Sequence, residues 1–395
     1  MTKSHIPYGR QTIDDDDVAA VAAALRADFL TTGPLVAQFE RAFAEKTGAA
    51  NAVACNSGTA ALHLAALALD LAEGQTAIIP AITFLATANV ARMTGAEVVF
   101  ADVDPATGLI TPESLEDARK RGAAAGKDIR AAMPVHLNGR LCDMEGLAAA
   151  TERHCIALVE DACHALGLAN IGAARHSVAA CFSTHPVKAI ATGEGGIVTT
   201  RDAEIAGRMR RLRSHGMIHE ASRFENRDSA FGDGAPNPWY YEMAEIGWNY
   251  RMPDILCALG LSQLQKLDRF HARRKNIAAQ YDRLLARLAP AIRPVSRPNE
   301  RHGWHLYVIY LDFPAMGTTR ARFMKALRDE GIDTQVHYIP LHRQPYYRRR
   351  YGDTSLPGAE EYYERCLSIP MFPAMRDDEV AHVASVLTRL AGADG

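Results

Sequence analysis

The amino-acid sequence predicts an α/β protein, with a large domain built on a mostly parallel sheet and a smaller C-terminal α+β domain. Short apolar runs alternate with helical patterns through the first two thirds of the chain, which is typical of strand–helix–strand units. The 395 residues exceed the roughly 250–300 at which a single hydrophobic core stops growing. A long helical pattern then leads into a second, shorter alternation. We expect the two domains to span residues 1–265 and 266–395.

The expected elements follow in chain order. Residues 13–34 show a helical pattern whose acidic start suits the positive end of a helix, and we expect Gly33-Pro34 to end it. Apolar runs in the large domain predict strands at 51–55, 76–80, 97–104, 129–136 and 156–161. Helical patterns there include 59–69, 84–93 and a long connector from about Leu264. The small domain contributes apolar runs at 305–312 and 333–339 and helical patterns at 319–331 and 376–391.

The charge balance and the cysteines exclude several classes of protein. Lys+Arg 44 against Asp+Glu 46 gives a net charge of −2, so no general positive field attracts nucleic acid or an anionic membrane. No segment has the roughly 18 uninterrupted apolar residues of a membrane helix. The seven scattered cysteines form no Cys-x-x-Cys pair, and the polar start of the chain does not resemble a secretory signal. We therefore expect a cytoplasmic protein with reduced thiols.

The segment CNSGTAALHLAALAL, residues 55–69, is a candidate anion site. A strand ends there, Gly58 permits close backbone approach, and Thr59 opens a helix whose free N–H groups favour an anion. The alternative is that Ser57 and Thr59 only cap the helix. Neither a Gly-x-Gly-x-x-Gly turn nor a Walker lysine loop is present, which disfavours nucleotide-cofactor redox chemistry and nucleoside triphosphate hydrolysis.

A second candidate is the carboxylate at the end of IALVEDACHALG, residues 156–167. Parallel strands present their carboxyl ends to a ligand crevice, so the pair Glu160-Asp161 should place a carboxylate in that crevice. A buried acid is costly unless a cation or hydrogen-bond donors meet it, which suggests a positively charged partner. Capping of the following turn is an equally plain explanation of this residue taken alone.

A third candidate lies in CFSTHPVKAIATGEGGIVTT, residues 181–200, where Ser183 follows a strand and Lys188 occupies a loop. A single lysine is usually a solvated surface charge. An anion cup, a carboxylate and an amine in crevice positions are together what pyridoxal 5′-phosphate (PLP) needs for its phosphate, its ring nitrogen and its aldehyde. The three segments together therefore favour a PLP site.

These segments resemble a known family. NSGTAALHLA, EDACHALG, FSTHPVKAIATGEGG, RSHGM and GWNYRM are similar to the DegT/StrS-type sugar aminotransferases, and the similarity extends nearly from end to end. The resemblance implies the fold of the fold-type I PLP-dependent transferases. One departure is Thr184, which follows Ser183 where the family usually has an aromatic residue.

The resemblance implies roles for the cofactor-side residues. Lys188 would form the Schiff base with PLP and, once released, carry a proton between substrate and cofactor. Asp161 would keep the pyridine nitrogen protonated, and His164 would orient Asp161. Phe84 would stack on the ring. The phosphate would be held by Gly58, Thr59 and Ser183.

The resemblance also implies a homodimer with active sites at the subunit interface. Asn249 is expected to reach the phosphate of the neighbouring subunit's cofactor. Residues that match positions lining the sugar-nucleotide side are Tyr8, Phe29, Thr31, His337 and Tyr338.

Within the family, IPYGRQTIDDDDVAAV, the HPVK loop and TQVHYIPLHRQPYY are most similar to members that act in pseudaminic acid biosynthesis. This implies transfer of an amino group from L-glutamate to a UDP-linked 4-keto-6-deoxy-N-acetylhexosamine, the UDP-2-acetamido-2,6-dideoxy-β-L-arabino-hexos-4-ulose. The alternatives are another nucleotide-4-ketosugar, of bacillosamine, 4-amino-arabinose or perosamine type, and a non-catalytic regulator of the same fold. PLP-dependent sugar dehydratases carry histidine in place of Lys188, which disfavours that class.

Two weaker signals complete the sequence. His215-x-x-x-His219 has the spacing of metal ligands, but no third ligand accompanies it, and we expect no metal. The segment 223–247 is longer than in many relatives, and its aromatic residues either stack on the uracil or sugar or only pack the loop. Those residues are Trp239, Tyr240 and Tyr241.

Overall fold

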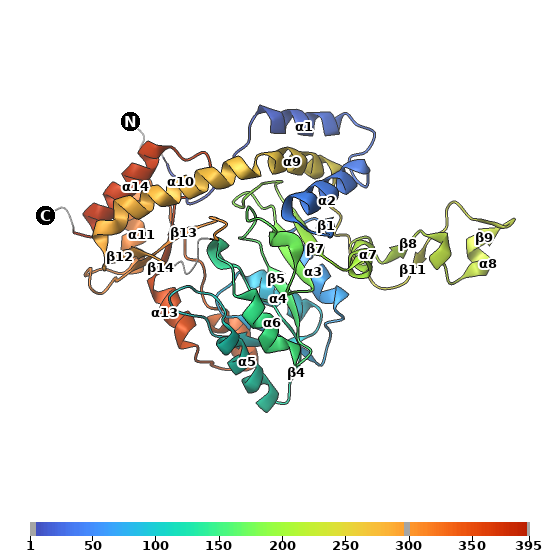
Figure 1. Ribbon diagram of the computed structural model, residues 1–395, viewed down its shortest axis with the longest axis horizontal. Coiled ribbons are helices and arrows are strands. Elements are labelled where there is room, and N and C mark those ends of the chain that lie inside the picture. The colour runs from blue at the N-terminus through green and yellow to red at the C-terminus, as the bar shows by residue number, and fades with distance from the viewer. Residues whose placement is uncertain (1–4, 296–300, 393–395) are drawn as a thin grey trace.

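The computed structural model describes residues 5–295 and 301–392. A large sheet covered by helices forms the middle of the molecule, and the C-terminal elements lie to one side of it (Figure 1). Two consecutive helices, α9 (Asp254–Gln265) and α10 (Leu267–Leu285), run along the top and join the two parts. The expected domain boundary at residues 265 and 266 falls at the break between these helices. The two-domain division itself stays a prediction.

The large sheet has seven strands in the order β1-β7-β6-β5-β4-β2-β3. Strand β7 is antiparallel to both neighbours and the other pairings are parallel, which agrees with the expected mostly parallel sheet. Each strand expected for the large domain is present. The bounds are β1 (Asn51–Cys55), β2 (Gln75–Pro80), β3 (Glu97–Ala101), β4 (Asp128–Ala132), β5 (Ala157–Asp161), β6 (Ala179–Ser183) and β7 (Gly196–Thr200).

Side chains along β1 alternate between the two faces of this sheet, and both faces are covered. Val53 and Cys55 pack in one core with helix α3 (Gly58–Ala68), whereas Ala52 and Ala54 pack in another with α2 (Pro34–Thr47) and α9. Further helices of this part are α4 (Leu85–Met93), α5 (Pro112–Ala124), α6 (Met144–Glu152) and α7 (Ala203–Leu212). Short 3-10 helices lie at Leu137–Gly139, Ile171–Ala173, Ala221–Arg223, Ala286–Leu288 and Leu341–Arg343.

The C-terminal part has its own antiparallel sheet and hydrophobic core. Its strands are β12 (Ile292–Pro294), β13 (Tyr307–Leu311) and β14 (Cys366–Ile369), in that order. Buried side chains of α10, α11 (Arg320–Asp329) and α14 (Asp377–Leu390) pack against the inner face of this sheet. Helices α12 (Pro345–Tyr351) and α13 (Pro357–Arg365) pack instead against the core of the large domain. The run at 333–339 forms no strand and pairs with β14 at a single bridge.

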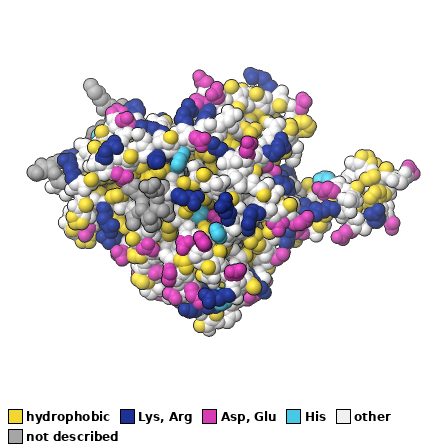
Figure 2. Space-filling model, in the orientation of Figure 1, with side chains coloured by type: hydrophobic (Ala, Val, Ile, Leu, Met, Phe, Trp, Pro, Cys, Tyr) yellow, Lys and Arg dark blue, Asp and Glu magenta, His cyan; other side chains and the backbone are white. Residues whose placement is uncertain are grey.

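An arm formed by residues 217–243 extends from the body beyond α7 (Figure 1). It contains the short strands β8 (Met217–Ile218), β9 (Phe231–Gly232), β10 (Ala235–Pro236) and β11 (Glu242–Met243) and the single turn α8 (Arg227–Ala230). Ile218, Phe224 and Ala230 form a small core of its own. Hydrophobic side chains nevertheless gather on its surface (Figure 2), and Trp239 is 73% exposed.

The expectation of one helix over residues 13–34 is wrong. Helix α1 (Asp15–Leu25) ends at Leu25, and Gly33 caps the start of α2, where Pro34 is the first residue. Proline at the first position of a helix loses no hydrogen bond, so Gly-Pro begins a helix here instead of ending one. The acidic run also does more than cap α1, because the ammonium of Lys266 pairs with Asp17 at 2.8 Å and ties α1 to the α9–α10 junction.

Asp254 holds the turn between α1 and α2 from a distant part of the chain. Its side chain is 0% exposed, and its two carboxylate oxygens accept from the backbone N–H groups of Gly33 at 2.8 Å and Leu35 at 2.9 Å. Its own N–H donates to the carbonyl of Leu30 at 3.0 Å. The carboxylate therefore satisfies the free N–H groups at the start of α2.

Replacing Asp254 by asparagine should lower the free energy of unfolding by about 1–3 kcal/mol, because the new amide NH₂ faces a backbone donor that is then left without an acceptor. Urea unfolding followed by circular dichroism measures the change. The matched control is Asp117→Asn on the exposed face of α5, which should change stability by about 0.5 kcal/mol or less. Equal effects of the two substitutions would contradict this role for Asp254.

Candidate active site

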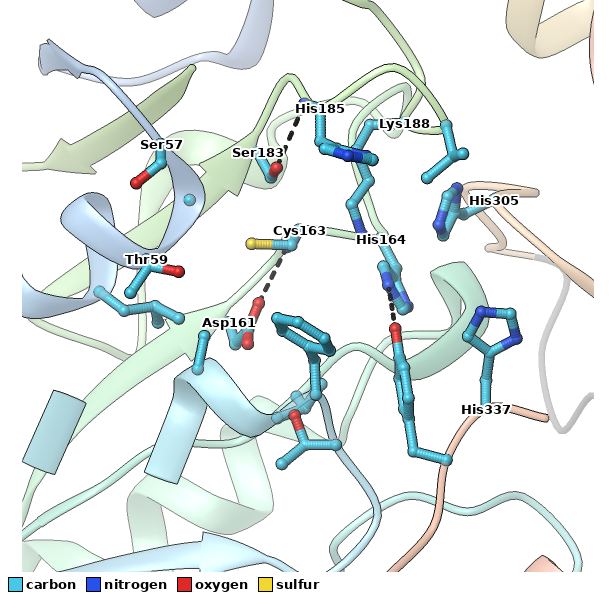
Figure 3. A pocket seen from close by; sticks show the side chains of 18 of the residues that line it. Ser57, Thr59, Asp161, Cys163, His164, Ser183, His185, Lys188, His305 and His337 are labelled. Atoms are coloured by element: carbon cyan, nitrogen blue, oxygen red, sulfur yellow. Dashed lines mark hydrogen bonds between the residues drawn. The ribbon is translucent and has the colours of Figure 1, made fainter. Parts of the chain in front are cut away.

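A cavity of about 390 Å³ lies beyond the carboxyl ends of β1, β2, β5 and β6, where a parallel sheet places ligands (Figure 3). Its walls come from the loops after these strands and from the segments around His305 and His337 of the C-terminal part. The site thus joins segments that lie far apart in the chain. The polar side chains that line it belong to Tyr8, Ser57, Thr59, Thr83, Asp161, Cys163, His164, Ser183, His185, Lys188, Glu194, His305, His337 and Tyr338.

One end of the cavity is suited to an anion. Ser57 Oγ accepts from the N–H of Ala60 at 3.1 Å and caps α3, whose other first-turn N–H groups have no partner within the helix. Gly58 has no room for a side chain, because a Cβ there would lie 2.8 Å from Cβ of Ser183. The capping and the binding explanations of this segment are therefore compatible, since Ser57 caps while Gly58 and Thr59 line the cavity.

Asp161 ends β5 and is 5% exposed. Its Oδ2 accepts from Thr87 Oγ1 at 2.7 Å and its Oδ1 accepts from the N–H of Cys163 at 3.2 Å. The preceding Glu160 does not line this cavity. Its carboxylate instead contacts His136 Nε2 at 2.8 Å, because consecutive strand residues point to opposite faces.

Lys188 lies on the loop between β6 and β7, and its side chain extends into the cavity toward His164 and Cys163 (Figure 3). Burial lowers the pKa of the Lys188 amine, and the groups of Cys163 and Asp161 partly oppose this effect. The Lys188 amine therefore loses its proton at a lower pH than an exposed lysine does. A base or a nucleophile must be in this neutral form.

Three buried histidines, His164, His305 and His337, line another wall of the cavity. The rings of His164 and His305 lie 4.3 Å apart, and His337 Nδ1 contacts Ser368 Oγ at 2.7 Å. Burial is the main cause that lowers the pKa of each, to about 3 for His337, and the charge of Lys188 contributes in all three. These imidazoles are therefore neutral near pH 7.

The tautomer of His164 follows from its contacts. Its Nδ1 accepts from the backbone N–H of Asn138 at 3.2 Å, so in the neutral ring the proton is on Nε2. That nitrogen lies 3.2 Å from the hydroxyl oxygen of Tyr338 and donates to it. The hydroxyl proton of Tyr338 is then left to donate to a group inside the cavity.

The structure brings together ten of the thirteen residues singled out from the sequence. Around the cavity lie Tyr8, Gly58, Thr59, Phe84, Asp161, His164, Ser183, Lys188, His337 and Tyr338. Phe29, Thr31 and Asn249 do not line it. All three are exposed, with Phe29 at 55%. The turn that carries Phe29 is hydrogen-bonded to Asp254, which lies five residues after Asn249 in the chain.

Sequence reasoning missed several residues of the site. Thr83, His185 and His305 line the cavity, and Thr87 contacts Asp161 from behind its wall. His305 had no signal, because one histidine at the start of an apolar run is indistinguishable from a core residue. Thr184, which departs from the family pattern, is buried and shares a 2.5 Å hydrogen bond with Thr192.

Comparison with known proteins assigns the family. The model of the DegT/DnrJ/EryC1/StrS aminotransferase family matches residues 11–388. The spore coat polysaccharide biosynthesis protein SpsC of Bacillus subtilis (strain 168) is 40% identical over 395 residues, covering 98% of each chain. The chain therefore belongs to the DegT/DnrJ/EryC1/StrS aminotransferase family.

Solved structures agree with this assignment. Helicobacter pylori PseC, an aminotransferase involved in the biosynthesis of pseudoaminic acid, superposes with a TM-score of 0.87 at 27% identity, over 99% of this chain and 100% of that chain. The PLP form of Spr1654 from Streptococcus pneumoniae, assigned as a sugar aminotransferase, gives 0.86 at 26% identity, over 98% of this chain and 99% of that chain. The same protein is also known in a PMP form. The expected fold type, the enzyme class and the PLP cofactor are confirmed.

The residues of the cavity fit PLP. Gly58, Thr59 and Ser183 line the cavity beside the free N–H groups at the start of α3, and this end of the cavity suits the phosphate. Asp161 presents a carboxylate for the ring nitrogen and Lys188 presents an amine for the aldehyde, both within the same cavity. Which residue contacts which part of the cofactor stays a prediction. Within the described part of the chain, no helix is both long and apolar enough to span a membrane.

Stability should fall as the pH drops below about 6.5. The three cavity histidines are neutral when folded, but in the unfolded chain each binds a proton below its ordinary pKa of 6.5. Unfolding therefore takes up protons. Each histidine adds up to about 1.4 kcal/mol per pH unit to the loss of unfolding free energy, until the pH reaches its pKa in the folded protein.

Urea unfolding on both sides of pH 6.5 measures this slope. His305→Asn should make the slope shallower by about one proton. An identical slope in His305→Asn and the unsubstituted protein would show that His305 is not a buried neutral group.

Proposed function

We propose that this enzyme is a sugar aminotransferase that converts a UDP-linked 4-keto-6-deoxy-N-acetylhexosamine into a 4-amino-4,6-dideoxy sugar, with L-glutamate as amino donor. The acceptor is UDP-2-acetamido-2,6-dideoxy-β-L-arabino-hexos-4-ulose, and the product serves pseudaminic acid synthesis. The observation that carries the proposal is the convergence of Lys188, Asp161 and the start of α3 on one cavity. The motifs shared with pseudaminic acid aminotransferases and the likeness to PseC support the choice of sugar.

Another nucleotide-4-ketosugar is the second candidate. The relative SpsC is named for spore coat polysaccharide biosynthesis and is more similar in sequence than PseC, which favours a sugar destined for a polysaccharide. Both candidates use the same chemistry at C4 of the sugar. They differ in how the ring lies against Tyr8, His337 and Tyr338, which line the cavity on the side away from α3.

The residues of the cavity divide the work of transamination. Bound PLP would supply an electron sink for the negative charge that develops on the substrate carbon attached to the transferred nitrogen. Asp161 would hold a proton on the ring nitrogen, and Lys188 would hold the cofactor in the resting enzyme. Once released, its neutral Nζ would remove a proton from the donor, and the protonated Nζ would later deliver a proton to C4 of the sugar. The Tyr338 hydroxyl, oriented by His164, donates to an oxygen of the substrate.

The functional unit is a homodimer in this proposal, and the protein is cytoplasmic. Phe29, Thr31 and Asn249 are exposed and lie outside the cavity of their own chain, which fits contributions to the site of a second copy. The exposed apolar side chains of the arm, among them Trp239 and Met243, fit burial against that copy.

Lys188→Ala should abolish both the visible absorbance of the bound cofactor and turnover, because no other lysine lines the cavity among the described residues. Absorbance spectra and a coupled assay for 2-oxoglutarate measure the two losses. Lys120→Ala, on an exposed side chain of α5, is the matched control and should behave as the unsubstituted enzyme. Undiminished activity of Lys188→Ala would refute the assignment.

A panel of UDP- and dTDP-4-ketosugars with L-glutamate should yield an amino sugar from the L-arabino-hexos-4-ulose, and NMR should define the configuration at C4. The panel includes the precursors of bacillosamine, 4-amino-arabinose and perosamine. Product from one of those sugars alone would exclude the specific choice and keep the aminotransferase. A colourless protein that stays colourless with added PLP would instead favour a non-catalytic regulator.

A further inference from the structure

Thr87 makes a contact that distinguishes it from the other buried threonines in helices of this protein. Thr47, Thr151 and Thr388 each donate their hydroxyl to the backbone carbonyl four residues earlier, at 2.7, 3.0 and 2.9 Å, which is the ordinary arrangement in a helix. Thr87, the third residue of α4, instead donates to Asp161 Oδ2 at 2.7 Å. The hydroxyl of Thr87 therefore contacts a residue 74 positions away in the chain, Asp161, in place of a carbonyl of its own helix.

A second hydroxyl, that of Thr83, contacts the hydroxyl of Thr87. Thr83 Oγ1 is 2.8 Å from Thr87 Oγ1, and both threonines are almost completely buried. A hydroxyl has one proton and an ionised carboxylate has none, so the proton of Thr87 is directed to Asp161 and the proton of Thr83 to Thr87. The result is a chain of donors that ends on the carboxylate.

The other oxygen of Asp161 is also fixed. It accepts from the backbone N–H of Cys163 at 3.2 Å, so one donor from α4 and one from the loop after β5 hold the two oxygens. Hydrogen bonds donated to a carboxylate favour its charged form. Thr87 is 0% exposed and does not line the cavity, so any effect it has on a bound cofactor must pass through Asp161.

We propose that Thr87 is a positioning residue of the aminotransferase reaction, which keeps the Asp161 carboxylate oriented toward the ring nitrogen of the cofactor. The inference rests on the placement of PLP in this cavity, proposed above. Thr83 supports Thr87 by supplying the second hydrogen bond. Without the Thr87 hydroxyl, Oδ2 loses its donor and the carboxylate can turn about its own bond away from the cofactor.

The test compares Thr87→Val, which removes the hydroxyl at nearly constant volume, with Thr87→Ser, which keeps it. Thr87→Val should weaken PLP binding to the apoenzyme by about tenfold or more. It should also lower kcat with little change in the KM of the sugar, and shift the pH titration of the visible absorbance of the bound cofactor. Thr87→Ser should restore all three. If Thr87→Val does not fold, Thr87→Ala makes the same comparison.

Two controls separate a positioning role from a structural one. Thr151→Val removes a back-bonded helix hydroxyl on α6 and should change the thermal midpoint of the apoenzyme without shifting the absorbance titration. Asp161→Asn should weaken PLP binding, and Thr87→Val added to Asp161→Asn should weaken it no further, because both act through one carboxylate.

The outcomes distinguish the inference from the proposal beneath it. If Asp161→Asn binds PLP as tightly as the unsubstituted enzyme with the same absorbance titration, the placement of the cofactor is wrong. If Asp161→Asn changes both while Thr87→Val changes neither, the placement stands and the role of Thr87 is refuted. Additive losses in the double variant would equally refute an action through Asp161.

Discussion

The burial of the Asp161 carboxylate is the constraint on which the arrangement of the site depends. A carboxylate that is 5% exposed needs hydrogen-bond donors in place of water. One donor is the N–H of Cys163 on the same loop, and the other is the hydroxyl of Thr87, 74 residues earlier in the chain. The loops after β2 and β5 must therefore stay in contact, and the sheet ensures this because β4 alone separates the two strands.

The distribution of positive charge in the cavity follows from the burial of its basic side chains. Desolvation lowers the pKa of Lys188 and of His164, His305 and His337, and the charge of Lys188 lowers the histidine values further. The three imidazole rings are therefore uncharged near pH 7. The anion end of the cavity is served mainly by the backbone dipoles at the start of α3, which cannot be titrated.

Much of the site could be predicted because of how parallel strands are connected. The residues after β1, β5 and β6 meet at one edge of the sheet, so Gly58, Asp161 and Lys188 were recognisable from their positions after strands. Thr87 and His305 were not recognisable. One lies in the first turn of a helix and the other opens an apolar run, and nothing in either local pattern shows that tertiary packing aims them at the cofactor site.

The sequence by itself determined the alternation of strands and helices, the mostly parallel sheet and the family, because these depend on local periodicity and on short motifs around glycine, aspartate and lysine. Tertiary structure alone decided that α1 ends at Leu25, that Asp254 caps α2, and that Phe29 and Thr31 lie outside the cavity of their own chain. The physical reason is range. Periodicity reports neighbours within a few residues, whereas a buried carboxylate takes its donors from wherever the fold brings them.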